Sequence, residues 1–531
     1  MGTTVKKNVT LATLSTVIAS SMVACPNPNA PINYKDEFPS LGANNNAKLV
    51  KAASDYGITK RPNVVFILLD DAGYGDISCN GQINFKTPNI DLLAQNGVRF
   101  VNHYAAAPVC APSRCGLMTG KTTGHTIIRG NAEIGGGVGL YPATVTKEGQ
   151  KGLPKEEYTL AELFKDAGYN TALVGKWGLG MPENGSSPLN KGFDRYYGHL
   201  CQRMAHSYFP THVWENDKKV VFSENNGLQG NVWLHDQFEE KTKAYLTDFI
   251  NDNKNSSKPF FFFGTYTIPH GALQIPKGKL TDTTYHPYVD CSWWKKASDD
   301  MKRYAIMMHR VDLTVGKIKD QLEEAGILDD TIFIFSSDNG PADEYGANPN
   351  FFESAGRFGK ERLRGIKRAL YEGGVKVPFI VSWPNKVKKG IESTHICAAY
   401  DIMATMAQIL GIDLNSKTNS DGLSFLPTLM DDLENQKIHP HLYWEFVGNR
   451  ATEGGGPKQG ARVGDWKAVL RFGAVNSATA GKGKIELYHL GADPGEKYNV
   501  AKYYPNITEA MRELLVSSHE DSSEFPQIKK N

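Results

Sequence analysis

The stretch Asn63-Val64-Val65-Phe66-Ile67-Leu68-Leu69-Asp70-Asp71 decides the fold class. Six consecutive apolar residues followed by two carboxylates are typical of a strand that is buried on both faces and ends at a polar site. Similar short apolar runs recur at residues 171–174, 260–263, 332–335 and 379–382. Helical patterns lie between these runs, at residues 159–167, 239–250 and 299–325. This alternation predicts an α/β fold with a mostly parallel central sheet flanked by helices.

The last part of the chain has a different pattern. Short strand-like pieces at residues 442–446, 466–470 and 485–489 surround a glycine-rich loop at 454–456, and a helical pattern covers 508–517. We therefore expect a smaller α+β subdomain with an antiparallel sheet. Its predicted bounds are residues 439–531, beside a main domain at 62–438.

The N-terminus resembles a processing signal. Lys6 and Lys7 precede a run of apolar and small residues, 9–24, that is too short to span a bilayer as a mature helix. The following Met22-Val23-Ala24-Cys25 is similar to a bacterial lipobox, with Met22 in place of the usual leucine. We expect residues 1–24 to be removed and Cys25 to be acylated; an ordinary secretory signal cut nearby is the alternative.

This signal predicts where the protein works. One acylated cysteine would tether the chain to a membrane surface without spanning the membrane. Residues 26–61, rich in Pro, Asn, Ala and Lys, would then form a tether. The protein is expected to cross the bacterial inner membrane and to act as a periplasmic or cell-surface lipoprotein.

The charge and cysteine content restrict the partners. The chain has 59 Lys and Arg against 57 Asp and Glu, and loss of the signal, which carries two lysines, makes these numbers equal. A neutral chain gives no electrostatic reason to expect a nucleic-acid partner. The seven cysteines show neither a CxxC pair nor a dense framework, so we expect mostly buried thiols.

The most specific motif is Cys110-Ala111-Pro112-Ser113-Arg114-Cys115-Gly116-Leu117-Met118-Thr119-Gly120. An isolated cysteine is more often a buried residue at a turn than a reactive one. This segment, however, resembles the signature of the type I sulfatases of the alkaline phosphatase superfamily, and the preceding Thr87-Pro88-Asn89-Ile90-Asp91 strengthens the resemblance.

The resemblance implies a covalent modification at the motif. A separate maturation enzyme would oxidise Cys110 to formylglycine, and Arg114 would orient this group. One hydroxyl of the hydrated aldehyde would attack the sulfur of a sulfate ester. The second hydroxyl would allow the sulfate to be released by elimination, which a plain serine could not do.

Polar residues at two strand ends suggest a metal site. Asp70 and Asp71 follow the first predicted strand, and Asp338 and Asn339 follow a later one. In open α/β sheets, ligand sites collect at the carboxyl ends of the strands. Taken alone, each pair is more often a turn or a helix cap. Carboxylate and amide oxygens favour Ca²⁺ or Mg²⁺. The resemblance implies Ca²⁺, with residue 110 as a further ligand; composition does not separate it from Mg²⁺.

Three more residues obtain roles from the resemblance. Lys176 and Lys367 would bind the sulfate group, and His270 would protonate the leaving alkoxide, for which a pKa near 6.5 is suitable. Gly178 departs from the family, which often has a histidine at this place in Gly-Lys-Trp-His-Leu-Gly. His206 is our candidate for the replacement or for a substrate contact; a structurally satisfied histidine is an equally good interpretation.

The resemblance covers about residues 62–499 and implies the alkaline phosphatase type of fold. It predicts a sulfuric ester hydrolase, and export favours sulfated carbohydrates as substrates. Two alternatives stay open at this point. A non-catalytic glycan-binding lipoprotein would account for Gly178, and a phosphate or phosphonate ester hydrolase would share the superfamily. Irregular loops at 216–236, 281–294 and 347–361 do not reveal the sugar.

Overall fold

The structure is a computed structural model that describes residues 51–131, 148–448, 456–472 and 483–525. The predicted signal, Cys25 and most of the predicted tether lie outside the described residues. Among the helices that the structure describes, none combines the length and the apolar character needed to cross a membrane. The six cysteines of this part of the chain are free thiols and four of them are buried, as expected.

A ten-stranded sheet forms the centre of the main domain, in the order β12-β2-β11-β8-β1-β7-β3-β4-β5-β6. The strands are β1 (Asn63–Leu69), β2 (Gly97–Tyr104), β3 (Asn170–Lys176), β4 (Arg195–His199), β5 (His212–Glu215), β6 (Lys218–Val221), β7 (Phe260–Thr265), β8 (Thr331–Ser337), β11 (Phe379–Ser382) and β12 (Ile391–Ala398). The core pairs β1–β8, β1–β7, β3–β7 and β3–β4 are parallel, while β11, β5 and β6 pair antiparallel with their neighbours. The predicted mostly parallel sheet is confirmed.

The central strand β1 explains why the opening motif is apolar throughout. All seven of its residues are buried. Phe66 and Leu68 point into one hydrophobic core, and Ile67 and Leu69 into a second core on the opposite face. Phe66 packs on Phe263 of the neighbouring strand at a ring-centroid distance of 4.9 Å. A strand covered on both faces tolerates no polar alternation.

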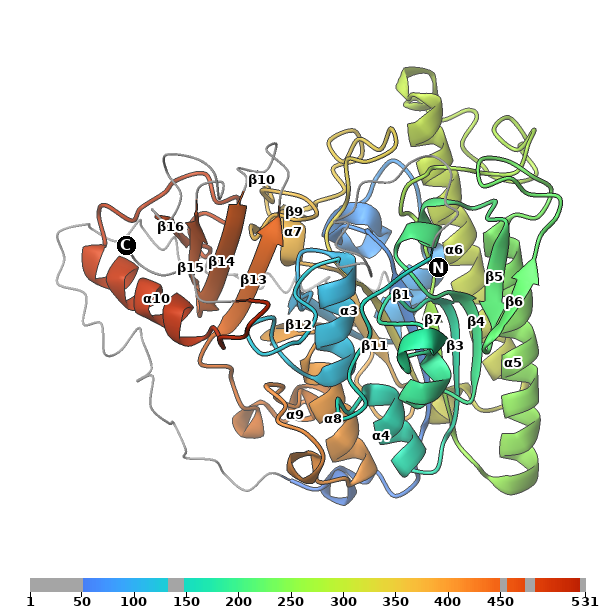
Figure 1. Cartoon of the computed structure of the whole chain (residues 1–531), viewed down its shortest axis with the longest axis horizontal. Helices are drawn as coiled ribbons and strands as arrows, with labels where there is room; N and C mark the ends of the chain where they lie inside the picture. Colours follow the sequence, from blue (N-terminus) through green and yellow to red (C-terminus); the bar gives the residue numbers. More distant parts are fainter. Residues whose placement is uncertain (1–50, 132–147, 449–455, 473–482, 526–531) are drawn as a thin grey trace, which may run out of the picture.

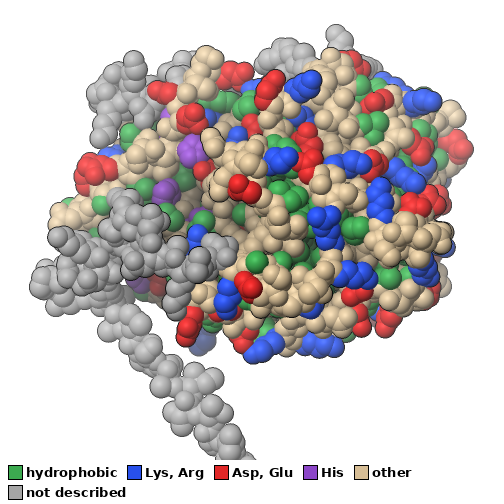
Figure 2. Space-filling model, turned by 90° about the horizontal axis from the view of Figure 1, so that it is seen from below, with side chains coloured by type: hydrophobic (Ala, Val, Ile, Leu, Met, Phe, Trp, Pro, Cys, Tyr) green, Lys and Arg blue, Asp and Glu red, His purple; other side chains and the backbone are tan. Residues whose placement is uncertain are grey.

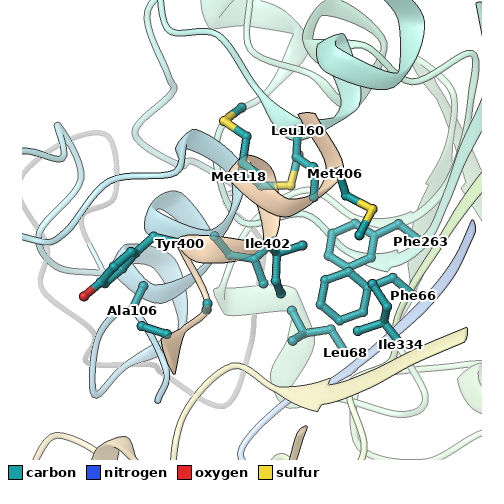
Figure 3. Close-up of a cluster of buried hydrophobic side chains, with 14 of the residues drawn as sticks. Phe66, Leu68, Ala106, Met118, Leu160, Phe263, Ile334, Tyr400, Ile402 and Met406 are labelled. Atoms are coloured by element: carbon teal, nitrogen blue, oxygen red, sulfur yellow. The ribbon is translucent and has the colours of Figure 1, made fainter. Parts of the chain in front are cut away.

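Helices form a layer on each face of this sheet (Figure 1). One layer contains α3 (Cys110–Thr119), α4 (Leu160–Asp166), α8 (Asp401–Leu410) and α9 (Leu426–Leu429); the other contains α2 (Pro88–Gln95), α5 (Leu234–Ser256) and α6 (Asp299–Glu324). Figure 3 shows the first core, in which side chains of α3, α4 and α8 lie together with those of β1, β7 and β8.

The C-terminal part forms a separate antiparallel sheet at the side of the main domain (Figure 1). Its strands are β13 (Leu442–Gly448), β14 (Gly456–Val463), β15 (Trp466–Arg471) and β16 (Lys484–His489), and α10 (Pro505–Ser517) packs against them. Trp444 joins this sheet to the main domain, because its indole nitrogen donates to the Ala105 carbonyl at 2.9 Å. Of the predicted glycine-rich loop at 454–456, Gly456 begins β14, and the other two residues lie outside the described residues.

The strands that the sequence patterns did not predict are the more polar ones. Among the strands of the large sheet, β2, β4, β5, β6 and β12 were missed. In β2 the partly exposed Arg99 and Asn102 interrupt the apolar run, and β6 is largely exposed. A two-stranded ribbon, β9 (Arg357–Phe358) with β10 (Glu361–Arg362), lies in the loop after β8. On the face shown in Figure 2, basic and acidic side chains are interspersed, in keeping with the neutral composition.

Candidate active site

The candidate site lies at the carboxyl ends of the central strands. Asp70 and Asp71 follow β1, Asp338 follows β8, and Lys176 is the last residue of β3. A backbone bridge between Asp70 and Pro269 extends this edge of the sheet toward His270. The parallel arrangement therefore brings together residues that are up to about 270 positions apart in the sequence.

Cys110 is the first residue of α3, and its thiol lies against the β1 carboxylates. Its Sγ is 3.3 Å from Asp70 Oδ1 and 3.9 Å from Asp71 Oδ1. The side chain is buried. Burial and, after it, the charge of Asp70 raise the pKa of the Cys110 thiol, so the unmodified residue is a neutral thiol and a poor nucleophile.

One group of side chains has the geometry of a metal site. Ligand atoms of Asp70, Asp71, Cys110 and His270 all lie within 4.8 Å of one another. At the edge of this group, Asn339 Nδ2 donates to Asp71 Oδ1 at 2.7 Å. The other amide atom, Asn339 Oδ1, is buried without a hydrogen-bond partner among the described residues. An orphaned amide oxygen beside two carboxylates fits a hard divalent cation, because such ions prefer oxygen ligands.

Three buried cations balance the carboxylates. Lys176 Nζ is 2.7 Å from Asp70 Oδ2, and Lys367 Nζ is 2.7 Å from Asp71 Oδ2. Arg114 donates through Nε to Asp338 Oδ2 at 2.9 Å and through Nη1 to the Lys176 carbonyl at 2.8 Å. Pairing of this kind is required because a buried charge without a partner is strongly destabilising.

His270 is held in one orientation beside Asp71. Its Nδ1 donates to the Gly271 carbonyl at 2.6 Å, which leaves Nε2 facing Asp71 Oδ2 at 3.6 Å. Burial lowers the pKa of His270 to about 3, so the imidazole is neutral in this environment. His206 packs edge-on against it, with 4.4 Å between the ring centroids, and thus lies on the His270 side of the site.

Two residues of the site were not singled out in the sequence. Glu344 lies six residues after Asp338, with its Oε2 3.5 Å from Lys367 Nζ and its Oε1 accepting from Arg368 at 2.7 Å. Tyr345 packs on His206 at a centroid distance of 5.2 Å. Both lie in an irregular loop, and a single acidic or aromatic residue in a loop carries no pattern that separates it from ordinary surface.

Gln202 occupies the space in which a side chain at position 178 would lie. Gly178 has φ +74°, and a Cβ added to it would be 2.1 Å from Gln202 Nε2 and 3.9 Å from Arg114 Cδ. Gln202 is buried, and its Oε1 has no hydrogen-bond partner among the described residues. The glycine at 178 is therefore matched to a glutamine at 202, two residues that are 24 positions apart.

We expect Gly178→Ala to destabilise the protein more than Gly185→Ala. Both glycines are left-handed, which costs a non-glycine residue roughly 1–2 kcal/mol, but a Cβ at Gly185 would meet nothing within 4 Å. Displacing the buried Gln202 should add about 1–3 kcal/mol at position 178 alone. Urea unfolding measures both values. The excess should disappear in a Gln202→Ala background, and an excess that persists there would contradict the steric match.

Comparisons with known proteins show the family. The profile described as Sulfatase matches residues 62–412, and that described as N-sulphoglucosamine sulphohydrolase, C-terminal, matches residues 365–521. Human arylsulfatase A is 30% identical over 494 residues, covering 88% of this chain and 89% of its own length. The N-acetylgalactosamine-6-O-sulfatase of Bacteroides thetaiotaomicron is 29% identical over 515 residues, covering 86% and 93%.

A solved structure shows the same architecture. The crystal structure of Ps i-CgsB in complex with k-i-k-neocarrahexaose superposes with a TM-score of 0.68 at 26% identity, covering 88% of this chain and 94% of that one. The chain therefore belongs to the sulfatase family and is a sulfuric ester hydrolase.

Proposed function

We propose that this enzyme removes sulfate groups from sulfated carbohydrates, using a formylglycine derived from Cys110 and a Ca²⁺ ion. The observation that carries the proposal is the buried contact of Cys110 with Asp70, next to the ion pairs of Lys176 with Asp70 and of Lys367 with Asp71. Carbohydrate as the substrate class is supported by the relative that is an N-acetylgalactosamine-6-O-sulfatase. A separate maturation enzyme would oxidise the cysteine.

The chain's own residues prepare position 110. A hydrated formylglycine there would supply one hydroxyl that attacks sulfur and a second whose deprotonation expels the sulfate. Position 110 begins α3, where the helix N-terminus favours developing negative charge. Arg114, one turn later, is fixed by Asp338 and by the Lys176 carbonyl, and so holds the N-terminal turn of the helix against the sheet edge.

The two lysines neutralise the sulfate group. Each donates to one carboxylate of the β1 end, and the charges of both lysines act on the Cys110 thiol. Both are buried, and cations in a water-excluded site stabilise charge that develops in the transition state far better than they would in water. Lys176 and Lys367 thus serve as the sulfate-binding pair.

His270 supplies the proton for the leaving oxygen. Because the Nδ1 proton is donated to the Gly271 carbonyl, a proton for the leaving alkoxide must be carried on Nε2, which requires the imidazolium form. The anionic ester would raise the low pKa of this histidine when it binds, since an adjacent negative charge favours the imidazolium. His206, packed against the His270 ring, would contact the substrate.

A divalent cation would be held by Asp70, Asp71, Asp338, Asn339 and residue 110. It would supply Lewis-acid polarisation of a sulfate oxygen and favour ionisation of the attacking hydroxyl. The oxygen-rich ligand set favours Ca²⁺ or Mg²⁺, and we propose Ca²⁺. In the exported protein, with Cys25 acylated, this site would face carbohydrates that arrive from outside the cell.

The experiment that tests the proposal is sulfate release from a panel of sulfated mono- and oligosaccharides. The protein is produced together with a formylglycine-generating enzyme, and peptide mass spectrometry establishes the state of residue 110. Release of sulfate from at least one sugar is the expected result. Failure of the fully modified protein on the whole panel, or faster hydrolysis of the matching phosphate esters, would contradict the proposal.

Removal of the metal should abolish turnover. We expect dialysis against a chelator to lower kcat/KM by about 10³-fold, because the ion contributes several kcal/mol to the transition state. The melting temperature should fall as well, since an ion that binds only the folded state stabilises it. Calcium should restore both quantities. If Mg²⁺ restores both quantities and Ca²⁺ does not, the bound ion is Mg²⁺ rather than Ca²⁺. Activity that survives chelation with an unchanged melting temperature would contradict the metal site.

A further inference from the structure

A row of three aromatic rings leads from the protein surface to the reaction centre. Tyr345 packs on His206 with 5.2 Å between the ring centroids, and His206 packs on His270 at 4.4 Å. His270 is 2% exposed and borders Asp71, whereas Tyr345 is 47% exposed. The tyrosine ring is therefore the exposed end of a row of contacts whose buried end is His270.

The backbone is built to place this ring. Tyr345 has φ +51°, in the left-handed region that non-glycine residues rarely adopt. Gly271, next to His270, has no side chain in the way: a Cβ there would be 2.6 Å from Cδ2 of the tyrosine. Strained backbone of this kind persists where the surrounding structure fixes it, and it is concentrated at ligand-binding sites.

The same loop is tied to the sulfate-binding lysine. Glu344, the preceding residue, accepts from Arg368 at 2.7 Å and lies 3.5 Å from Lys367 Nζ. The backbone nitrogen of Lys367 donates to the Pro341 carbonyl at 2.9 Å. These contacts set a fixed distance between the position of the sulfate group and the Tyr345 ring, as a binding site for one rigid ligand requires.

We propose that Tyr345 is the stacking platform for the sugar ring that carries the sulfate. This inference rests on the proposed function, because it takes the leaving oxygen at His270 to belong to a sugar. A hexopyranose has a face of C–H groups that packs on an aromatic ring while its hydroxyls remain in water. The sulfate-bearing sugar would then lie over Tyr345, with its ester oxygen directed past His206 toward His270.

The test compares Tyr345→Ala and Tyr345→Phe with the wild type, using full-length protein modified at residue 110. Tyr498→Ala is the matched control, since Tyr498 is 71% exposed and lies in the C-terminal part. Two quantities are measured: KM and kcat for the best sugar of the panel, and the inhibition constant of inorganic sulfate. Sulfate occupies the lysine end of the site and has no ring to stack.

We expect Tyr345→Ala to raise KM about five- to ten-fold with kcat within about two-fold, while the sulfate inhibition constant stays unchanged. Tyr345→Phe and Tyr498→Ala should resemble the wild type. An unchanged KM in Tyr345→Ala, or an inhibition constant that rises together with KM, would overturn the platform while leaving the proposed function intact. A wild type that releases sulfate from no sugar would overturn both.

Discussion

Cys110→Ala is expected to lower kcat/KM for a sulfated sugar by at least about 10⁴-fold, because it removes the group that attacks sulfur. Alanine cannot be converted to formylglycine, and its methyl side chain is not a nucleophile. Cys110→Ser should be almost equally inactive, although serine keeps a hydroxyl in the same place. A serine sulfate would lack the second hydroxyl and would be as inert as the substrate. Steady-state kinetics with a sensitive sulfate assay measures both variants.

Cys115→Ala is the control for this prediction. Cys115 is also a buried free thiol of α3, but it belongs to the hydrophobic core rather than to the site. Its replacement should keep kcat and should not prevent the mass change at residue 110. Wild-type activity in Cys110→Ala, or an unmodified thiol at residue 110 in fully active protein, would exclude formylglycine chemistry. A Cys115→Ala variant as inactive as Cys110→Ala would show that the helix, rather than the residue, was damaged.

The residues that the sequence identifies most easily are those attached to a strand end. Asp70, Asp71, Asp338 and Lys176 each follow or close a buried apolar run, and parallel strands bring such ends to one edge. A residue at the carboxyl end of a predicted parallel strand is therefore expected to lie at this edge of the sheet. The pattern predicted the helices at 299–325 and 159–167 to within one residue at each end, whereas the predicted helix at 239–250 covers only the middle of α5.

The residues that it misses depend on tertiary packing. Gln202, Glu344 and Tyr345 lie in loops, and each acts through a partner far away in the chain. Gln202 fits at the site because Gly178 has no side chain there. Tyr345 likewise packs where a side chain at position 271 would lie. No periodicity records such pairings. The sequence showed Gly178 only as a missing histidine, whereas the structure shows what fills the space.

The sequence pattern also does not reveal the ion pairs between the small sheet and the main domain, because they depend on tertiary packing. Lys467 of β15 donates to Glu372 of α7 (Glu372–Val375) at 2.8 Å and lies 3.2 Å from Glu496. All three side chains are buried, so the C-terminal sheet is attached to the segment that follows Lys367. The sequence predicted the small sheet as an element, but not that its interface with the main domain is charged.

Lys367→Met is expected both to destabilise the fold and to impair turnover, because one buried ammonium group serves two acids. Lys367 Nζ lies 2.7 Å from Asp71 Oδ2 and 3.5 Å from Glu344 Oε2. Methionine fills a similar volume, so the loss is one of charge rather than of packing. Removing one partner of a buried pair costs about 3–5 kcal/mol. We expect kcat/KM to fall by about 10²- to 10³-fold, as when one electrostatic contact to the transition state is removed.

The pH dependence of this loss follows from Glu344. Burial acts to raise the pKa of Glu344, but Lys367 and then Arg368 hold it well below its ordinary value of 4.5. A carboxyl whose pKa is lowered by folding stabilises the protein above its unfolded pKa, and this contribution is lost as the pH falls through its folded pKa. Without Lys367 the pKa of Glu344 in the folded protein rises. The loss of unfolding free energy in Lys367→Met, relative to the wild type, should therefore be largest at neutral pH. It should shrink as the pH falls below about 4.5.

Lys388→Met provides the matched control, because Lys388 and Asp431 form an ion pair in which both side chains are more than half exposed. Its loss should change the unfolding free energy by no more than about 1 kcal/mol and should leave kcat unaltered. Urea unfolding at pH 7 and pH 4 measures the stability of both variants. A Lys367→Met protein as stable as the wild type at pH 7 would mean that Asp71 and Glu344 obtain their compensation elsewhere. The lysine would then act on the sulfate group alone, and the fold would not depend on the charge that catalysis uses.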